Sequence, residues 1–313
     1  MASKHHPSRS YNSQQAPGHL TGLHLAAFFG LEEVTNALLE RSHSPDLKDS
    51  YGRTPLSWAT RNGQEVIVEL LLGTTGVKPD SQDNWGQTPL SWAARNGHET
   101  VVKLLLTVHS INPDSKANDR RTPLSWAAAN GNETIVKMLL GTRGVEPDSK
   151  DIWDQTPLSW AARNGREAVA KLLLTRSDVN IVSKSKYGRT PLSLAAVKGR
   201  EAVLKLLLAT DGIEPDSKDN NGQTPLSWAA RKGHQSAVKL LLTMGRVDPD
   251  SKDTRGQTPL TWAARNGYGE VVKLLLATDG VELDPKDEDG HTPLWWAASR
   301  GHESVVNMLQ SRF

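Results

Sequence analysis

Thr54-Pro55-Leu56-Ser57-Trp58-Ala59 is a stretch that the chain repeats, with small changes, every 34 residues. Its first three residues recur at 88–90, 122–124 and on to 292–294, and 21–23 is a diverged first copy that lies 33 residues before Thr54. Self-similarity at a period of roughly 20 to 50 residues marks a repeat architecture, in which each unit buries its apolar face against its neighbours. Nine units then cover residues 21–313, and we expect one elongated array that offers a long surface rather than a pocket.

Each unit predicts two short helices followed by an extended link. In the seventh unit Thr224 can cap a helix, Pro225 suits its first turn, and Gly233 suits its left-handed end. Apolar residues at helical spacing over 237–242 predict a second helix. The link over 247–256 is rich in Asp, Pro and Gly, so we expect a finger whose turn needs a positive φ at Gly256.

The unit resembles the ankyrin repeat, with its Asp-x-x-Gly-x-Thr-Pro-Leu opening, its Ala-Ala and Gly-His pairs and its Leu-Leu-Leu close. The resemblance implies an all-α solenoid of nine helix pairs linked by β-hairpin-like fingers, with the finger tips and first helices lining a concave face. Residues 1–20 are expected to be a disordered lead-in. The repeat domain, 21–313, has units starting near 21, 49, 83, 117, 151, 185, 219, 253 and 287.

One departure from the ankyrin pattern is systematic: the His that usually follows Thr-Pro-Leu is Ser in most units and survives only as His24. This sequence pattern, together with residues 21–27, resembles the ankyrin tails of fungal NACHT-type (NLR-like) receptors. A phosphate-binding Gly-x-x-x-x-Gly-Lys-Ser/Thr loop is absent from the sequence, so the resemblance brings no ATPase activity with it.

Composition narrows the class of protein. Only Lys4 and Arg9 are charged before residue 21, which leaves 35 basic and 35 acidic side chains in the array. A neutral array has no overall field for nucleic acid. No apolar run approaches about 18 residues, cysteine is absent, and residues 1–18 lack the apolar stretch of a secretory signal. We therefore expect an intracellular monomer, in the cytoplasm or nucleus, that binds protein and neither nucleic acid nor membrane.

One helix position carries tryptophan in most units and leucine in the sixth. Its members are Trp58, Trp92, Trp126, Trp160, Leu194, Trp228, Trp262 and Trp296. The functional alternative is an aromatic ladder for a ligand. We interpret the position as core, because leucine replaces the ring and the leucines of the second helix need packing partners.

The finger tip, three residues before each Thr, varies in chemistry while its neighbours stay constant. It holds Tyr51, Trp85, Trp153 and Tyr187 in four units and Asp119, Asn221, Arg255 and Asp289 in the others. Exposed Tyr and Trp are enriched at binding hot spots, so these four rings are candidate partner contacts. The alternative is that they lie flat against adjacent fingers.

A basic row stands seven residues after the Thr, at Arg61, Arg95, Arg163, Arg231 and Arg265. Arg beside Tyr and Trp suits an acidic, partly apolar protein segment. The alternative is a solvated helix end, where a basic side chain favours the dipole. Phe28 and Phe29, at the helix end of the first unit, are further candidates, since polar residues would suit a free end better.

We predict no catalytic, cofactor-binding or metal-binding residues. The run 287–290 faintly resembles a calcium loop, but its first and last ligand positions are Pro285 and Trp296. His98, His234 and His302 recur too far apart along the stack to share a metal. The leading hypothesis is a non-enzymatic protein-binding scaffold. The alternatives are a detached recognition module of a fungal NLR-like receptor and, far behind, an enzyme with an unrecognised site.

Overall fold

The computed structural model describes residues 20–41, 43–243 and 247–311. The expected lead-in over 1–20 therefore lies, apart from Leu20, outside the described residues. The described part of the chain contains 18 α-helices and no β-strand. The helices form nine consecutive pairs, as the repeat predicted.

Two rows of helices make up the array. The first helices of the pairs are α1 (Gly22–Phe29), α3 (Pro55–Asn62), α5 (Pro89–Asn96), α7 (Pro123–Asn130), α9 (Pro157–Asn164), α11 (Pro191–Val197), α13 (Pro225–Lys232), α15 (Pro259–Arg265) and α17 (Pro293–Ser299). The second helices are α2 (Glu32–Glu40), α4 (Glu65–Leu72), α6 (Glu99–Leu106), α8 (Glu133–Leu140), α10 (Glu167–Leu174), α12 (Glu201–Leu208), α14 (Gln235–Thr243), α16 (Gly269–Leu276) and α18 (Glu303–Gln310).

The first helix of each pair begins and ends as the sequence indicated. In α3 the Thr54 side chain accepts the backbone N–H of Ser57 at 3.2 Å, and Pro55 occupies the first turn. The helix ends at Gly63, whose φ is 71°. A Cβ there would also lie 2.6 Å from Nδ1 of His98 in the next unit. Glycine is therefore required both by the backbone and by the close approach of the following repeat.

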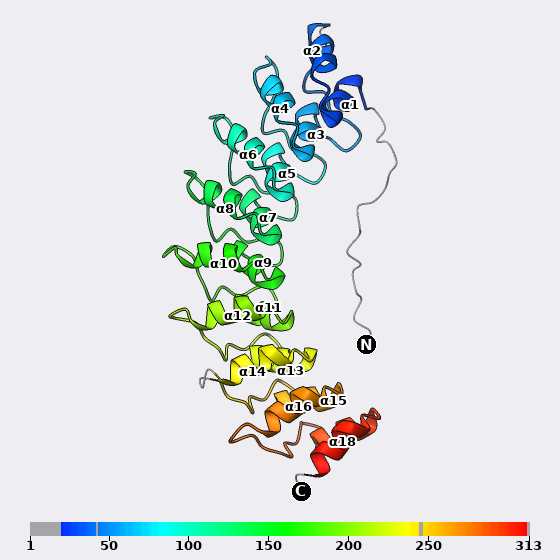
Figure 1. The fold of residues 1–313 in the computed structure, drawn as a ribbon, viewed down its shortest axis with the longest axis vertical. Coiled ribbons are helices and arrows are strands. Elements are labelled where there is room, and N and C mark those ends of the chain that lie inside the picture. Colours follow the sequence, from blue (N-terminus) through cyan, green and yellow to red (C-terminus); the bar gives the residue numbers. More distant parts are fainter. Residues whose placement is uncertain (1–19, 42, 244–246, 312–313) are drawn as a thin grey trace.

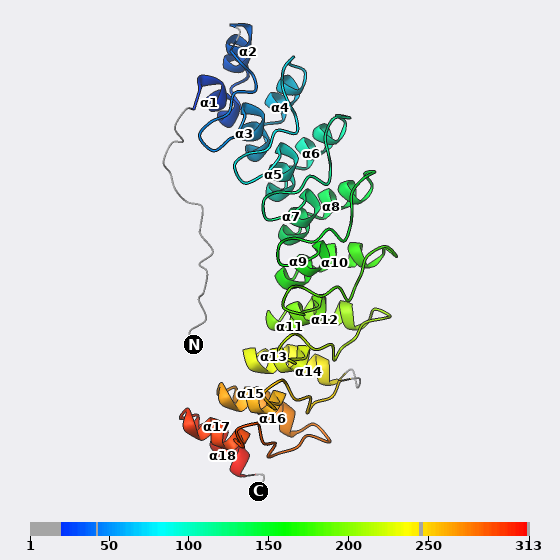
Figure 2. The same cartoon turned by 180° about the vertical axis from the view of Figure 1, so that it is seen from behind.

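The pairs stack side by side into a curved array (Figures 1 and 2). The odd-numbered helices pack against one another along the inner, concave side, and the even-numbered helices form the outer row. One apolar core runs the whole length between the rows, with Leu56, Ile67 and Leu71 of the second unit all within 1% of full burial. The inner units thus bury their apolar faces against their neighbours.

The fingers are tight turns that bind their neighbours through the backbone. In the second unit the Asp49 N–H donates to the Arg53 carbonyl at 2.9 Å, and the turn passes through Gly52 with φ 71°. Asn84 N–H of the next finger donates to the Tyr51 carbonyl at 2.9 Å. The reversal is hairpin-like, as expected, but the described fingers contain no strand.

No helix in the described ranges combines the length and the apolar character that crossing a bilayer requires.

Candidate functional site

The tryptophan position joins each first helix to its own finger through a hydrogen bond. In six units the indole Nε1 donates to the carboxylate of an aspartate nine residues earlier. The pairs are Trp58–Asp49 at 2.9 Å, Trp92–Asp83 at 3.0 Å, Trp160–Asp151 at 2.9 Å, Trp228–Asp219 at 2.9 Å, Trp262–Asp253 at 3.0 Å and Trp296–Asp287 at 2.8 Å. Five of these rings are buried, which agrees with the interpretation as core, and each also anchors its finger.

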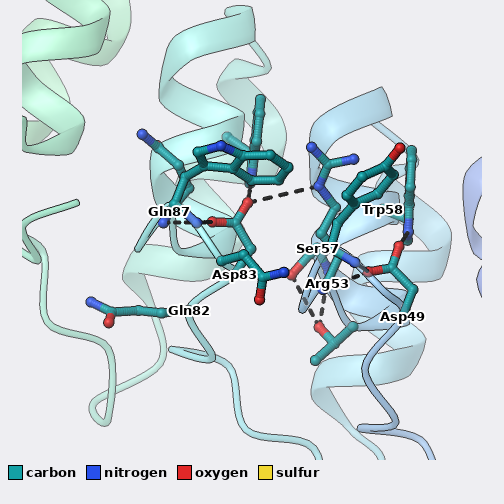
Figure 3. A network of polar contacts seen from close by, with 12 residues as sticks. Asp49, Arg53, Ser57, Trp58, Gln82, Asp83 and Gln87 are labelled. Atoms are coloured by element: carbon teal, nitrogen blue, oxygen red, sulfur yellow. Dashed lines mark hydrogen bonds and ion pairs between the residues drawn. The ribbon is translucent and has the colours of Figure 1, made fainter. Parts of the chain in front are cut away.

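Each of these aspartates is a hub that accepts several hydrogen bonds, all but Asp253 are buried, and Asp83 shows the pattern (Figure 3). Its Oδ1 accepts the backbone N–H groups of Trp85 and Gln87, both at 2.9 Å. Its Oδ2 accepts the Trp92 indole and lies 3.7 Å from Nε of Arg53 in the preceding unit. The carboxylate therefore fixes the turn of its own finger and draws the neighbouring unit's arginine onto the face.

The predicted basic row lies between successive tryptophan rings. The Arg61 guanidinium is 5.3 Å from the Trp58 ring centroid and 4.8 Å from that of Trp92. Arg95, Arg231 and Arg265 bridge their own and the next ring in the same way, whereas Arg163 contacts Trp160 alone because the next unit carries Leu194.

All five arginines of this row lie in the last turn of their helices, where the dipole favours a cation, and they are half-buried rather than fully solvated. Burial lowers the pKa of four of them, Arg61, Arg163, Arg231 and Arg265. They stay cationic at neutral pH, because an arginine titrates far above it. Partly desolvated cations on aromatic rings give this face an aromatic and positively charged character.

A second set of arginines on this face was missed by the sequence reasoning. Arg53 lies 5.1 Å from the Tyr51 centroid, 4.8 Å from Trp58 and 5.2 Å from Trp85. Arg121 and Arg189 occupy the same position and also contact rings. The sequence does carry a signal for this second set, because the residue just before each Thr is Arg, Gln or His in units two to nine.

The four aromatic finger tips differ in exposure. The Tyr51 and Trp85 rings of adjacent fingers lie 5.6 Å apart, and Trp153 lies 6.5 Å from Trp160. These three rings are half-buried, whereas Tyr187 is 54% exposed. The first three tips thus pack on their neighbours and still offer part of their surface, and their role as partner contacts stays a prediction.

The regular pattern breaks in the fourth unit, where Ala117 stands at the aspartate position. Nε1 of Trp126 has no hydrogen-bond partner within the described residues, and neither does Oε1 of Gln87 in the preceding unit. A cavity of about 280 Å³ lies beside this break. Its lining residues are Arg53, Arg61, Trp85, Gln87, Trp92, Arg95, Asn118, Asp119 and Trp126. The expectation of a surface without a pocket is therefore wrong at this point.

One group of side chains has the composition of a metal site. Ligand atoms of Asp287, Asp289 and His291 lie within 4.8 Å of one another. The Asp287 carboxylate, however, already accepts the Trp296 indole and the backbone N–H of His291, both at 2.8 Å. It is thus the same structural hub as in the other units.

The recurring histidines bind the preceding unit. Nε2 of His98, His234 and His302 lies 3.0–3.2 Å from a backbone carbonyl of that unit. At the N-terminal end Phe28 is 36% exposed and its ring lies 5.5 Å from Trp58, while Phe29 is 62% exposed. The two phenylalanines thus extend the aromatic row beyond the second unit.

Two comparisons with known proteins agree with this architecture. A family model for ankyrin repeats (3 copies) matches residues 5–83, 67–151, 140–219, 158–253 and 226–312, nearly the whole chain. Rabankyrin-5 of Mus musculus is 41% identical over 58 residues, which is 18% of this chain and 5% of that protein. The second match therefore covers one to two repeats of a much longer protein.

Proposed function

Because this chain belongs to the ankyrin repeat family, we propose that it is a non-enzymatic scaffold that binds a partner protein on the concave face of units two to six. Ankyrin repeats indicate a protein–protein interaction scaffold. The observation that carries the location is the set of aromatic finger tips in these units, each of which lies beside a guanidinium group of the face. Trp, Tyr and Arg are the residues most enriched at binding hot spots.

This face is held in place before any partner arrives. The Arg53 cation lies among four rings, Tyr51, Trp58, Trp85 and Trp92, and its Nε faces the buried Asp83. Side chains that are already ordered lose less conformational entropy on binding. The later units carry Asn221, Arg255 and Asp289 at the tips, which offer less apolar area to a partner.

The test is affinity capture from the native cell followed by binding measurements on variants. We expect Trp85→Ala with Trp153→Ala to weaken binding of the captured partner at least tenfold, because truncated hot spots typically cost about 2 kcal/mol or more. The matched control is Tyr268→Ala with Trp295→Ala, two exposed aromatic residues outside units two to six. Normal binding by the first variant would place the site elsewhere, with Phe28 and Phe29 the next candidates.

A second candidate is the detached recognition module of a fungal NLR-like receptor. It is favoured by the apolar side chains on the outer end of unit one, where Phe29 is 62%, Leu31 47% and Val34 46% exposed. A neighbouring domain packed on that end would cover them. Crosslinking at position 29 that captures an NTPase would favour this candidate, and capture confined to the concave face would favour the scaffold alone.

A further inference from the structure

The fourth unit is the one place in the described array where a ladder tryptophan lacks its aspartate. Trp126 is present but Ala117 replaces the acceptor, so its buried indole N–H stays without a partner. In the sixth unit both members change together, to Ser185 and Leu194. A buried donor left without an acceptor typically costs about 1–3 kcal/mol. Such a group in a native structure calls for an explanation.

The glutamine before the gap shows a matching deficit. Gln223 donates through Nε2 to the aspartate of the next unit at 3.4 Å, while its Oε1 accepts from Arg231 at 3.1 Å. Gln257 is held in the same way. Gln87 has alanine in place of that aspartate, and its Oε1 has no partner in the described chain. An aspartate at this position would accept the Trp126 indole N–H and an N–H of the Gln87 amide, as it accepts from Gln223 and Gln257 in the later units.

The cavity at this gap has the charge and the walls for a carboxylate. Three arginines line it, Arg53, Arg61 and Arg95, against the single carboxylate of Asp119. Asp119 lies 3.6 Å from Arg121, which offsets part of its charge. The guanidinium groups of Arg95 and Arg121 lie 4.3 and 4.4 Å from the Trp126 ring centroid. Partial burial strengthens the attraction of these cations for an anion.

We propose that this cavity binds an aspartate or glutamate side chain of the partner protein, whose carboxylate takes the place of the aspartate that the fourth unit lacks. The carboxylate accepts the Trp126 indole N–H, and the Gln87 amide turns to present its NH₂ group, because the two orientations of an amide differ little in shape. The stem of the acidic side chain packs on Trp85 and Trp92. The proposal rests on the proposed function and names the chemistry that its concave face selects.

Size and charge favour a protein side chain over other anions. A water takes about 30 Å³ of liquid volume, so a cavity of about 280 Å³ holds a side chain with its stem. A phosphate of a nucleic acid would bring a charged backbone along fingers that carry Asp83, Asp119 and Asp151. The array as a whole is also charge-balanced, which gives no steering for nucleic acid.

The test places a carboxylate of this chain itself in the proposed site. Ala117→Asp supplies the missing carboxylate, and Ser185→Asp adds the same charge at the same repeat position two units away. The indole N–H resonances of the full chain are followed by NMR while a capped deca-glutamate peptide is added, with deca-glutamine as the uncharged control. Trp126→Phe assigns the Trp126 signal.

We expect deca-glutamate to move the Trp126 signal in the wild type and in Ser185→Asp but not in Ala117→Asp, and deca-glutamine to move it in none. Ala117→Asp should bind labelled deca-glutamate at least tenfold more weakly and melt at or above the wild-type temperature. If that variant melts lower, Trp126→Phe decides, since it keeps an aromatic ring and removes the N–H donor. A threefold or greater loss of affinity in Trp126→Phe would then support the site, and unchanged affinity would overturn it.

Two further results would overturn the proposal. One is an equal Trp126 shift with inorganic phosphate or oligothymidylate at the same concentration, which would indicate a small-anion or nucleic-acid site. The other is normal binding of the captured partner by Ala117→Asp while Trp85→Ala with Trp153→Ala fails to bind. The partner would then bind the concave face without using the cavity, and the proposed function would still hold. Normal binding by both variants would instead refute the concave site itself.

Discussion

Replacing Asp151 with alanine removes the acceptor of several donors at once. Asp151 is fully buried, and its Oδ1 accepts the backbone N–H groups of Trp153 and Gln155 at 2.8 and 2.9 Å. Its Oδ2 accepts the Trp160 indole at 2.9 Å and lies 3.7 Å from Nε of Arg121. The variant therefore leaves one indole N–H and two finger N–H groups without their acceptor and removes one of the two carboxylates beside the half-buried Arg121.

The expected loss follows from these contacts. A buried donor left unsatisfied costs about 1–3 kcal/mol, and breaking a buried charge pair from one side costs about 3–5 kcal/mol. These free-energy costs do not add in full, because the finger N–H groups can turn toward water and because Asp119 stays 3.6 Å from Arg121. We expect a loss of roughly 3–4 kcal/mol in the free energy of unfolding.

Urea unfolding followed by circular dichroism, with hydrogen exchange to locate the effect, checks this value. Because stability in a solenoid is a sum over units and their interfaces, the loss should concentrate in units four to six. Asp178→Ala is the control, since this exposed carboxylate pairs with Arg176 at the surface and its removal should leave the unfolding curve essentially unchanged. A change below about 1 kcal/mol for Asp151→Ala would refute the reasoning that the carboxylate hub stabilises the stack.

The remaining predictions concern backbone, pH and shape. Arg120 and Asp154 have φ values of 61° and 55° at the turn position where other units have glycine. Arg120→Gly and Asp154→Gly should therefore each raise stability by about 1 kcal/mol in urea melts. Lower stability would contradict the inference that the backbone is strained there. Burial raises the pKa of five finger aspartates above 3.8, so their ionised forms oppose folding and stability should rise as the pH falls through the raised values toward 3.8. The five are Asp80, Asp114, Asp148, Asp216 and Asp250. Exchanging all five for asparagine should reduce this pH-dependent rise in stability in thermal melts, and an unchanged pH profile would refute the prediction. Small-angle scattering should give a monomeric particle ~90 Å long, at ~10 Å per unit, and a compact or dimeric particle would contradict it.

The helix pairs were predictable because their signals are local. Thr54, Pro55 and Gly63 act within one helix, through a cap, a permitted ring and a left-handed end. Gly52 likewise acts within one turn, although Arg120 and Asp154 show that the turn tolerates other residues. The 34-residue period then supplies the stacking, because a repeated apolar face can be buried only against its own copy.

The candidate site was only partly predictable. The rings and the basic row could be named from exposure and chemistry, but Arg61 was placed beside the tips and in fact lies between Trp58 and Trp92. Arg53 was not predicted, because its place in the site comes from contacts with four rings that belong to two units. Side chains 34 residues apart meet only through the offset and curvature of the stack, which no single repeat encodes.

By itself, the sequence determined the fold class, the number of helix pairs and the residue types along the concave face, since period, caps and composition are properties of the chain alone. Only the tertiary structure decided which of those residues touch. The finger folds back so that Asp83 reaches the indole of Trp92, nine residues away. Once that pairing is known, Ala117 becomes a missing carboxylate beneath Trp126 rather than one more small residue in a variable finger.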